Sequence, residues 1–184
     1  MTVSISLSRR GRLLLGGLTV VGGGGTGIYA ATDDDPSRAD RERVRTDTAP
    51  LRRRFTSIGQ LSDPHWLGFN PNRHGRESVP EPDPQIRVVG IARLPAGRAA
   101  ALVGLTAYGF SPGVPEPAPT ALERFLPEHA RWLTSPRYDR HITQAVYRGR
   151  FHFDLGTNSV YFDTVNPEFV PGVVDPTEAA EPPV

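Results

Sequence analysis

The stretch IRVVGIAR, from Ile86 to Arg93, decides the fold. Its centre carries three β-branched side chains, Val88, Val89 and Ile91, so it is apolar on both faces, as in a strand that is covered on both sides. Pro95 follows directly and suits the first turn of a helix, because the amide that proline lacks would be unpaired there. The sequence therefore predicts a central strand and, immediately after it, a helix.

Two helices are predicted after this strand. The first covers residues 95–108, and Gly109 can end it with a left-handed backbone. The second begins at Thr120, because Thr120-Ala-Leu-Glu123 fits a capping box. Its apolar stripe continues to Leu133, and Pro127 should kink it or divide it into two short helices.

A β-hairpin is predicted near the end of the domain. Gln144 to Phe153 and Ser159 to Thr164 form its strands, and residues 154–158 form its turn. Gly149 falls among aromatic residues of one parity and is a candidate for a bulge. Phe55 to Leu61 is interpreted as a short strand or a turn of helix.

The segment from Ser62 to Pro84 is predicted to be a loop, because its five prolines remove backbone donors. Within the domain at residues 55–167, the elements then follow the order β-α-α-β-β. This order favours an α+β fold, a small, mainly antiparallel sheet with two helices on one face. Residues 168–184 are acidic and proline-rich, and we predict a disordered tail there.

Composition excludes several classes of function. The chain has 184 residues and no Cys, so disulfides, thiol catalysis and thiolate metal sites are excluded. All 21 basic residues are Arg, and 18 of them lie beyond Thr32 together with all 20 acidic residues. That part of the chain is therefore slightly acidic, which argues against general nucleic-acid binding.

An uncharged run, LLLGGLTVVGGGGTGIYAA from Leu13 to Ala31, follows Ser8-Arg9-Arg10-Gly11-Arg12. A basic segment before an apolar run is the pattern of an export signal or an N-terminal anchor. As a helix the run would span roughly 28 Å, close to the thickness of a hydrocarbon core. Residues 1–32 are therefore predicted to be a signal peptide or a hydrophobic membrane helix, with the domain outside. Cleaved and uncleaved forms are both open, because no good Ala-x-Ala site follows.

The start of the chain is similar to a twin-arginine export signal, a recognised address for bacterial export. Arg9 and Arg10 match the pair, and Leu13 and Leu14 match the apolar residues that follow. Arg12 departs from the usual pattern. Together with the composition, these features resemble exported or membrane-anchored proteins of actinobacterial type. The resemblance implies a location and no activity.

Residues 33–54 are interpreted as a charged linker arm. Seven arginines and three acids lie between Arg38 and Arg54. One interpretation is a patch that touches anionic lipid head groups. The favoured alternative is a solvated stalk that keeps the domain off the membrane.

Two pairs of side chains are candidates for catalysis, Asp63 with His65 and His152 with Asp154. A carboxylate two residues from an imidazole can orient it for general-base work. On a strand, His152 and Asp154 would project to the same side, and the favoured interpretation is the polar outer face of the hairpin. The five histidines show no metal-ligand spacing, and the sequence has no phosphate loop, dinucleotide fingerprint or nucleophile elbow. We expect no metal and no cofactor.

Four further residues are candidates for ligand binding. Trp66 and Phe69 could form an aromatic platform, although fastening the predicted loop to the core is favoured. Arg148 and Arg150 alternate along one strand face, where they could receive a phosphate or a carboxylate. Pairing with Asp163 across the hairpin is the favoured alternative.

The leading hypothesis is a non-enzymatic binding or interaction domain outside the cell, either tethered to the membrane through Leu13 to Ala31 or secreted after cleavage. Its partner would be a protein or an envelope component. The alternative is a small exported hydrolase or lyase that uses a His/Asp pair. A third hypothesis is a subunit of a membrane complex, in which the apolar run packs through its glycines. An imidazole beside a carboxylate in a concave pocket would favour the enzyme.

Overall fold

The computed structural model describes residues 36–72 and 85–173, which belong to one compact unit that spans residues 33–184. The apolar run from Leu13 to Ala31, most of the proline-rich segment after residue 72 and the tail from residue 174 lie outside the described residues. The predictions for these segments therefore stay predictions. Within 36–72 and 85–173, no helix is both long enough and apolar enough to cross a membrane.

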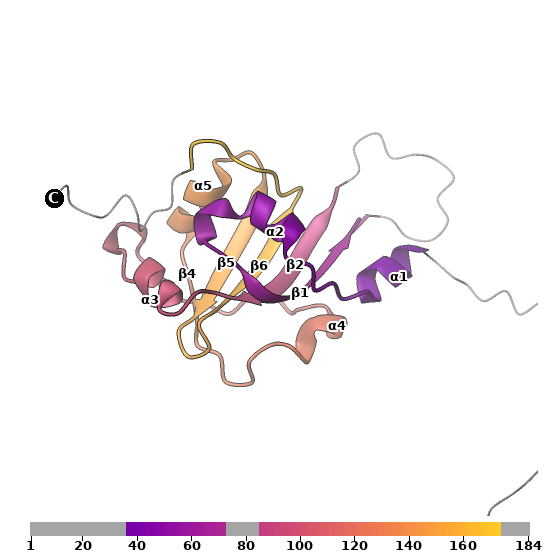
Figure 1. Cartoon of the computed structure of the whole chain (residues 1–184), viewed down its shortest axis with the longest axis horizontal. Coiled ribbons are helices and arrows are strands. Elements are labelled where there is room, and N and C mark those ends of the chain that lie inside the picture. Colours follow the sequence, from indigo (N-terminus) through magenta and orange to yellow (C-terminus); the bar gives the residue numbers. More distant parts are fainter. Residues whose placement is uncertain (1–35, 73–84, 174–184) are drawn as a thin grey trace, which may run out of the picture. The chain divides into compact units, whose positions relative to one another are not determined.

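The described residues form one antiparallel sheet of six strands in the order β1-β2-β6-β5-β4-β3 (Figure 1). The strands are β1 (Ser62–Phe69), β2 (Arg87–Arg93), β3 (Ser111–Pro112), β4 (Trp132–Thr134), β5 (Arg148–Asp154) and β6 (Ser159–Val165). The α+β class with an antiparallel sheet is confirmed, but six strands replace the three that the sequence predicted.

The predicted central strand is confirmed as β2, which lies between β1 and β6. Because side chains alternate along a strand, Val88, Gly90 and Ala92 face one side of the sheet, and Val89 and Ile91 face the other. All five residues are buried. Both faces of β2 are therefore covered, as its apolar pattern predicted.

The predicted hairpin is confirmed as β5 and β6, except that β5 begins at Arg148, because residues 144–147 form the turn after α5. Their register runs without a shift along both strands, so the bulge considered at Gly149 is absent. A Cβ at Gly149 would come within 3.2 Å of side-chain atoms of Thr143, Tyr147 and Thr164. The glycine is needed at this position for space.

Short helical segments cover one face of the sheet. They are α2 (Ala49–Arg54), η1 (Thr56–Ile58), α3 (Arg98–Val103) and α5 (Pro136–Thr143). Their apolar side chains pack on Phe151, Phe153 and Phe162, with ring centroids of Tyr138 and Phe153 5.4 Å apart. Burying each such aromatic side chain contributes roughly 1.5–3 kcal/mol, so this face supplies the main core.

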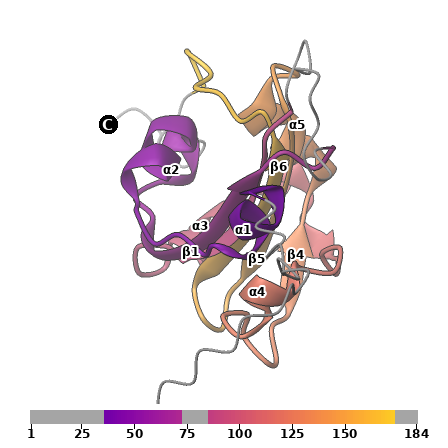
Figure 2. The ribbon, with the colours of Figure 1, turned by 90° about the vertical axis from the view of Figure 1, so that its right-hand side faces the viewer.

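The other face of the sheet is also covered. Figure 2 shows α4 (Thr120–Glu123) on the opposite side of the sheet from α2. Leu122 of α4 and the nearby Phe125 pack with Val89 and Tyr161 in a second, smaller core cluster. Helices restricted to one face were predicted, and the structure corrects this. The physical reason is that β2 carries apolar side chains on both faces of the sheet, so other segments have to cover both faces.

The loop predicted at Ser62 to Pro84 is wrong in its first part, which forms β1. Pro64 is compatible with a strand here because β1 is at the edge of the sheet, where one side of the backbone needs no ladder partner. Asp63 has a positive φ of 45°, and the register with β2 shifts between Ser62 and His65, so the start of β1 bulges.

The helix predicted to begin at Thr120 does begin there, as α4, but its predicted continuation to Leu133 is wrong. α4 ends at Glu123, and its N-cap is Pro119 rather than Thr120, so the predicted capping box does not form. Leu133 instead belongs to the strand β4, and Pro127 lies in the connection before it. The first predicted helix is divided into α3 and the 3-10 turn η2 (Thr106–Tyr108), and Gly109 ends it with φ of 59° as expected.

The described part of the predicted linker arm is folded onto the sheet. It forms α1 (Pro36–Glu42), which lies along β1, and α2, whose Leu51 is 1% exposed in the main core. Between them, Arg45 exchanges two backbone hydrogen bonds with Trp66 of β1, at 2.8 and 3.0 Å. The folded unit therefore begins before residue 55, and Val170 extends its core beyond residue 167.

Candidate functional site

Strand β5 is longer than its neighbour β4, and this leaves part of its edge open. β4 pairs only with His152–Asp154, so residues 148–151 of β5 have no adjacent strand on that side. The start of α5 fills part of the gap, where Asp139 Oδ1 accepts the Phe151 amide at 3.0 Å. Ser135 caps this helix, because its hydroxyl accepts the Tyr138 amide at 3.1 Å.

A pocket of about 520 Å³ lies beside this open edge. Its wall comes from α5, from the turn after it and from β5, and β2, β6 and the segment after β3 contribute Arg87, Asp163 and Glu116 at the rim. The residues that matter for its chemistry are Asp139, Arg140, Tyr147, Arg148, Gly149 and Arg150. Arg148 and Arg150 are two residues apart on a strand, so they project to the same face. The pair that the sequence singled out for an anion therefore does line one pocket.

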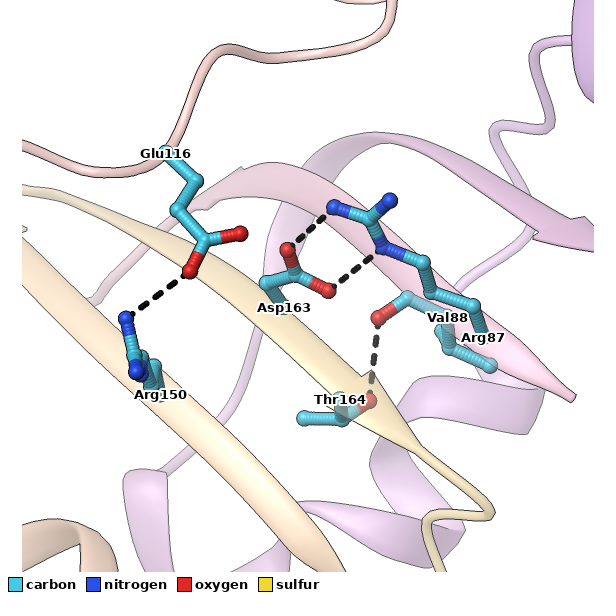
Figure 3. A network of polar contacts seen from close by, with 6 residues as sticks. All are labelled: Arg87, Val88, Glu116, Arg150, Asp163 and Thr164. Atoms are coloured by element: carbon cyan, nitrogen blue, oxygen red, sulfur yellow. Dashed lines mark hydrogen bonds and ion pairs between the residues drawn. The ribbon is translucent and has the colours of Figure 1, made fainter. Parts of the chain in front are cut away.

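Figure 3 shows how the charges at the rim of this pocket are paired. Asp163 of β6 accepts two hydrogen bonds from Arg87 of β2, with 2.8 Å between Nε and Oδ1. Glu116, in the proline-rich segment after β3, accepts one from Arg150 Nη1 at 3.0 Å. The prediction that Asp163 pairs with Arg148 or Arg150 is wrong, because Arg87 reaches it from the other neighbouring strand with a bidentate geometry.

Two arginines of the pocket keep an unpaired charge. In the part of the chain that the structure describes, neither Arg140 nor Arg148 forms an ion pair or a side-chain hydrogen bond, and both are exposed. The rim acids already neutralise Arg87 and Arg150, so Asp139 is the remaining acid of the pocket. Guanidinium groups that lack an ion-pair partner bind carboxylates and phosphates well, because their planar donors match two oxygens at once.

Burial raises the pKa of Asp139 from 3.8 to about 7. The hydrogen bond from the Phe151 amide and the positive charges of Arg150 and Arg140 oppose this rise in the pKa but do not cancel it. Near neutral pH the carboxyl group is therefore divided between its neutral and charged forms. Its protonation removes the negative charge that would repel a bound anion.

Tyr147 and Gly149 also line the pocket. Tyr147 is 6% exposed, and its hydroxyl has no hydrogen-bond partner among the described residues. Burial raises the pKa of Tyr147, and the negative charge of Asp139 raises it further, so the hydroxyl stays protonated. Alternate amides of an antiparallel strand point to opposite edges. The Gly149 amide therefore points, like that of Phe151, toward the open edge of β5.

The high pKa of Asp139 predicts a pH-dependent stability. We expect Asp139→Asn to be more stabilising at pH 8 than at pH 5, by about 2 kcal/mol. The pKa of the carboxyl is raised in the folded state, so the stability it contributes is full only below its ordinary pKa of 3.8 and is lost as the pH rises from there through about 7. Asn keeps the oxygen that accepts from Phe151 but carries no charge. Urea unfolding at both pH values measures the effect, and an equal change at pH 5 and pH 8 would contradict the assignment.

His152 and Asp154 do not form a catalytic pair. Asp154 is buried and accepts hydrogen bonds from the Arg131 amide and from Thr157 at 2.7–2.8 Å, so it holds the turn between β5 and β6. His152 is buried against the edge of the Tyr161 ring, and burial lowers its pKa. The polar outer face predicted for the hairpin is wrong here, because the segment around α4 covers this side of the sheet.

Asp63 and His65 lie close together in β1, but each side chain contacts a different residue and not the other. The His65 ring stacks on Phe125 with centroids 3.9 Å apart, and Asp63 Oδ2 lies 3.6 Å from Arg93 Nε. Both line a small pocket of about 240 Å³. Among the described histidines, none is hydrogen-bonded to a carboxylate. The geometry that would favour the enzyme is thus not found in this part of the chain.

Trp66 and Phe69 face opposite sides of β1, so they form no shared aromatic platform. Trp66 packs in the main core, and its indole N–H donates to the Asp47 carbonyl at 3.0 Å. Phe69 packs in the smaller cluster on the other face. Both residues fasten a strand, rather than a loop, to the rest of the domain.

Sequence reasoning missed several residues of the pocket. They are Arg87, Glu116, Asp139, Arg140 and Tyr147. The one signal for them was Ser135-Pro136, which begins α5 and places Asp139 in its first turn. Read as a helix start, this pair would have placed Asp139 and Arg140 on a helix next to the strand that carries Arg148.

No family model matches this chain, and no curated protein and no solved structure is significantly similar to it.

Proposed function

We propose that this protein is a non-enzymatic binding domain outside the cell, and that the pocket beside β5 receives an oxyanion. The oxyanion is a carboxylate or phosphate group of a small molecule or an envelope component. One observation carries the proposal. Arg140 and Arg148 are unpaired guanidinium groups in a pocket whose remaining acid, Asp139, titrates near neutral pH.

The same pocket favours binding over hydrolysis. A hydrolase needs a nucleophile with a base beside it, aimed at a common point. No histidine of the described residues lines this pocket, and Asp139 is hydrogen-bonded to a backbone amide. A carboxyl with a pKa near 7 is the feature that supports the hydrolase alternative, because such a group can act as a general acid or base. Binding requires only the donors that are present.

The proposed location rests on the sequence of residues 1–32. Leu13 to Ala31 would either hold the domain at the outer side of the membrane or be removed during export. Mass spectrometry of the exported protein distinguishes the two, since an intact segment means an anchor and its loss means secretion. Recovery of the full chain only from the cytosol would contradict the location.

Titration of the full-length protein with sulfate tests the binding site. Sulfate keeps its charge between pH 6 and pH 8, so a change in affinity reports on the protein. We expect calorimetry to show that sulfate binds about tenfold more tightly at pH 6, where Asp139 is mostly neutral, than at pH 8. In Asp139→Asn, the affinity should be high and equal at both pH values. A pH dependence that survives in this variant, or no sulfate binding at either pH, would refute the proposal.

A further inference from the structure

A second pocket, of about 560 Å³, lies at the β1 edge of the sheet, where the segment that carries α1 and α2 meets β1 and β2. Much of its wall is the segment that the sequence identified as a charged arm. Residues of the predicted linker arm therefore form one side of this pocket.

The charged residues of this pocket are Asp40, Arg45, Arg53 and Arg54. Arg54 has a structural role, because it donates to the carbonyls of Pro167 and Pro50, each at 3.0 Å. Arg45 lies with its guanidinium 5.0 Å from the centre of the Trp66 ring. Arg53 is exposed, and no other described residue pairs with it. The pocket thus has an excess of positive charge and one unpaired guanidinium.

Most of the remaining wall of this pocket is apolar, although Asn70 also lines it. Leu51, Trp66 and Val88, which share one face of the sheet, contribute to it, and Ile86 beside them is 42% exposed. Gly68 leaves the middle of this wall without a side chain, since a Cβ there would lie 3.1 Å from the Trp66 ring. A ligand that satisfies both parts of the wall carries an anionic group and an apolar part.

We propose that this pocket binds the head group of an anionic phospholipid. The proposal rests on the proposed location of the domain outside the membrane. Asp40 follows Ala31, the end of the apolar run, by nine residues. Nine residues reach about 30 Å at most even when fully extended, and Asp40 lies inside α1, so a run embedded in a bilayer would hold Asp40 within that distance of its end. A free phosphate ion would leave the apolar wall unused.

Short-chain lipids test this site on the full-length protein in a non-ionic detergent. Dihexanoyl phosphatidylglycerol should bind, and the zwitterionic dihexanoyl phosphatidylcholine should bind about tenfold more weakly by calorimetry. Arg53→Ala should weaken binding of the anionic lipid about tenfold. Arg52→Ala is the matched control, because Arg52 is exposed on the same helix but does not line the pocket. It should bind like the wild type.

Three results would overturn the lipid site. They are equal losses in Arg52→Ala and Arg53→Ala, equal affinity for the two lipids, and inorganic phosphate binding as tightly as the anionic lipid. Arg148→Glu should leave lipid binding unchanged, so failure of the pocket beside β5 is distinguishable from failure of this one. The assay does not depend on export either, so a wrong location would appear as recovery of the full chain only from the cytosol and not in these affinities.

Discussion

Gly90→Ala is expected to lower the free energy of unfolding by about 3–5 kcal/mol, the largest loss of stability that we predict for a single methyl group. A Cβ at Gly90 would lie 2.5 Å from the His65 carbonyl oxygen and from Trp66 Cβ, and 2.8 Å from Trp66 Cα. Backbone atoms cannot rotate away as the end of a side chain can. β1 would have to move off β2, and Trp66 would move with it.

The loss should be large because Trp66 connects several parts of the fold. It packs in the main core and exchanges backbone hydrogen bonds with Arg45, which leads into α2. The total stability of a domain is about 5–15 kcal/mol, so the variant should be largely unfolded under mild denaturing conditions. Gly156→Ala is the control, because its Cβ would make an ordinary 3.4 Å contact with Asp154. Urea unfolding followed by circular dichroism measures both, and a Gly90→Ala protein within 1 kcal/mol of wild type would refute this packing.

Arg148→Glu is expected to weaken sulfate binding at least about 100-fold. The substitution removes a charged donor and places a carboxylate beside the site where the anion binds. Arg148 is exposed and unpaired among the described residues, so the change should leave the unfolding midpoint almost unaltered.

Arg137→Glu is the matched control for this prediction. Arg137 is exposed on α5, close to Arg140 in sequence, but it does not line the pocket. Both variants change the net charge by the same amount. Calorimetry should show near-normal affinity for Arg137→Glu. Equal losses in the two variants would mean that sulfate responds to the overall charge and that the pocket is not its site.

The elements that the sequence predicted well are those whose pattern is local. β2 and the hairpin show apolar alternation that needs no knowledge of the rest of the chain. β1 was missed because Pro64 indicates a loop unless the strand is known to lie at an edge. β4 was missed because Leu133 continues a helical spacing of apolar residues. Which of these patterns prevails depends on contacts between distant segments, and one sequence does not show them.

The same division applies to the candidate site. Alternation on a strand was enough to place Arg148 and Arg150 on one face. The approach of α5 to the open edge of β5 is a tertiary feature. The sequence alone therefore could not predict the position of Asp139 or its raised pKa. The sequence also could not predict that the segment around α4 covers this face of the sheet. This cover buries His152, which was predicted to be exposed.

The Gly149 amide offers the most direct test of the oxyanion pocket. Its resonance can be followed in a ¹H–¹⁵N spectrum of the full-length protein at pH 6 while sulfate is added. We expect a saturable shift at residues 148–150, with the same half-saturation as the calorimetric signal, and an unchanged Gly156 resonance. Unchanged resonances at 148–150 at sulfate concentrations that saturate the calorimetric signal would contradict the assignment of anion binding to the open edge of β5.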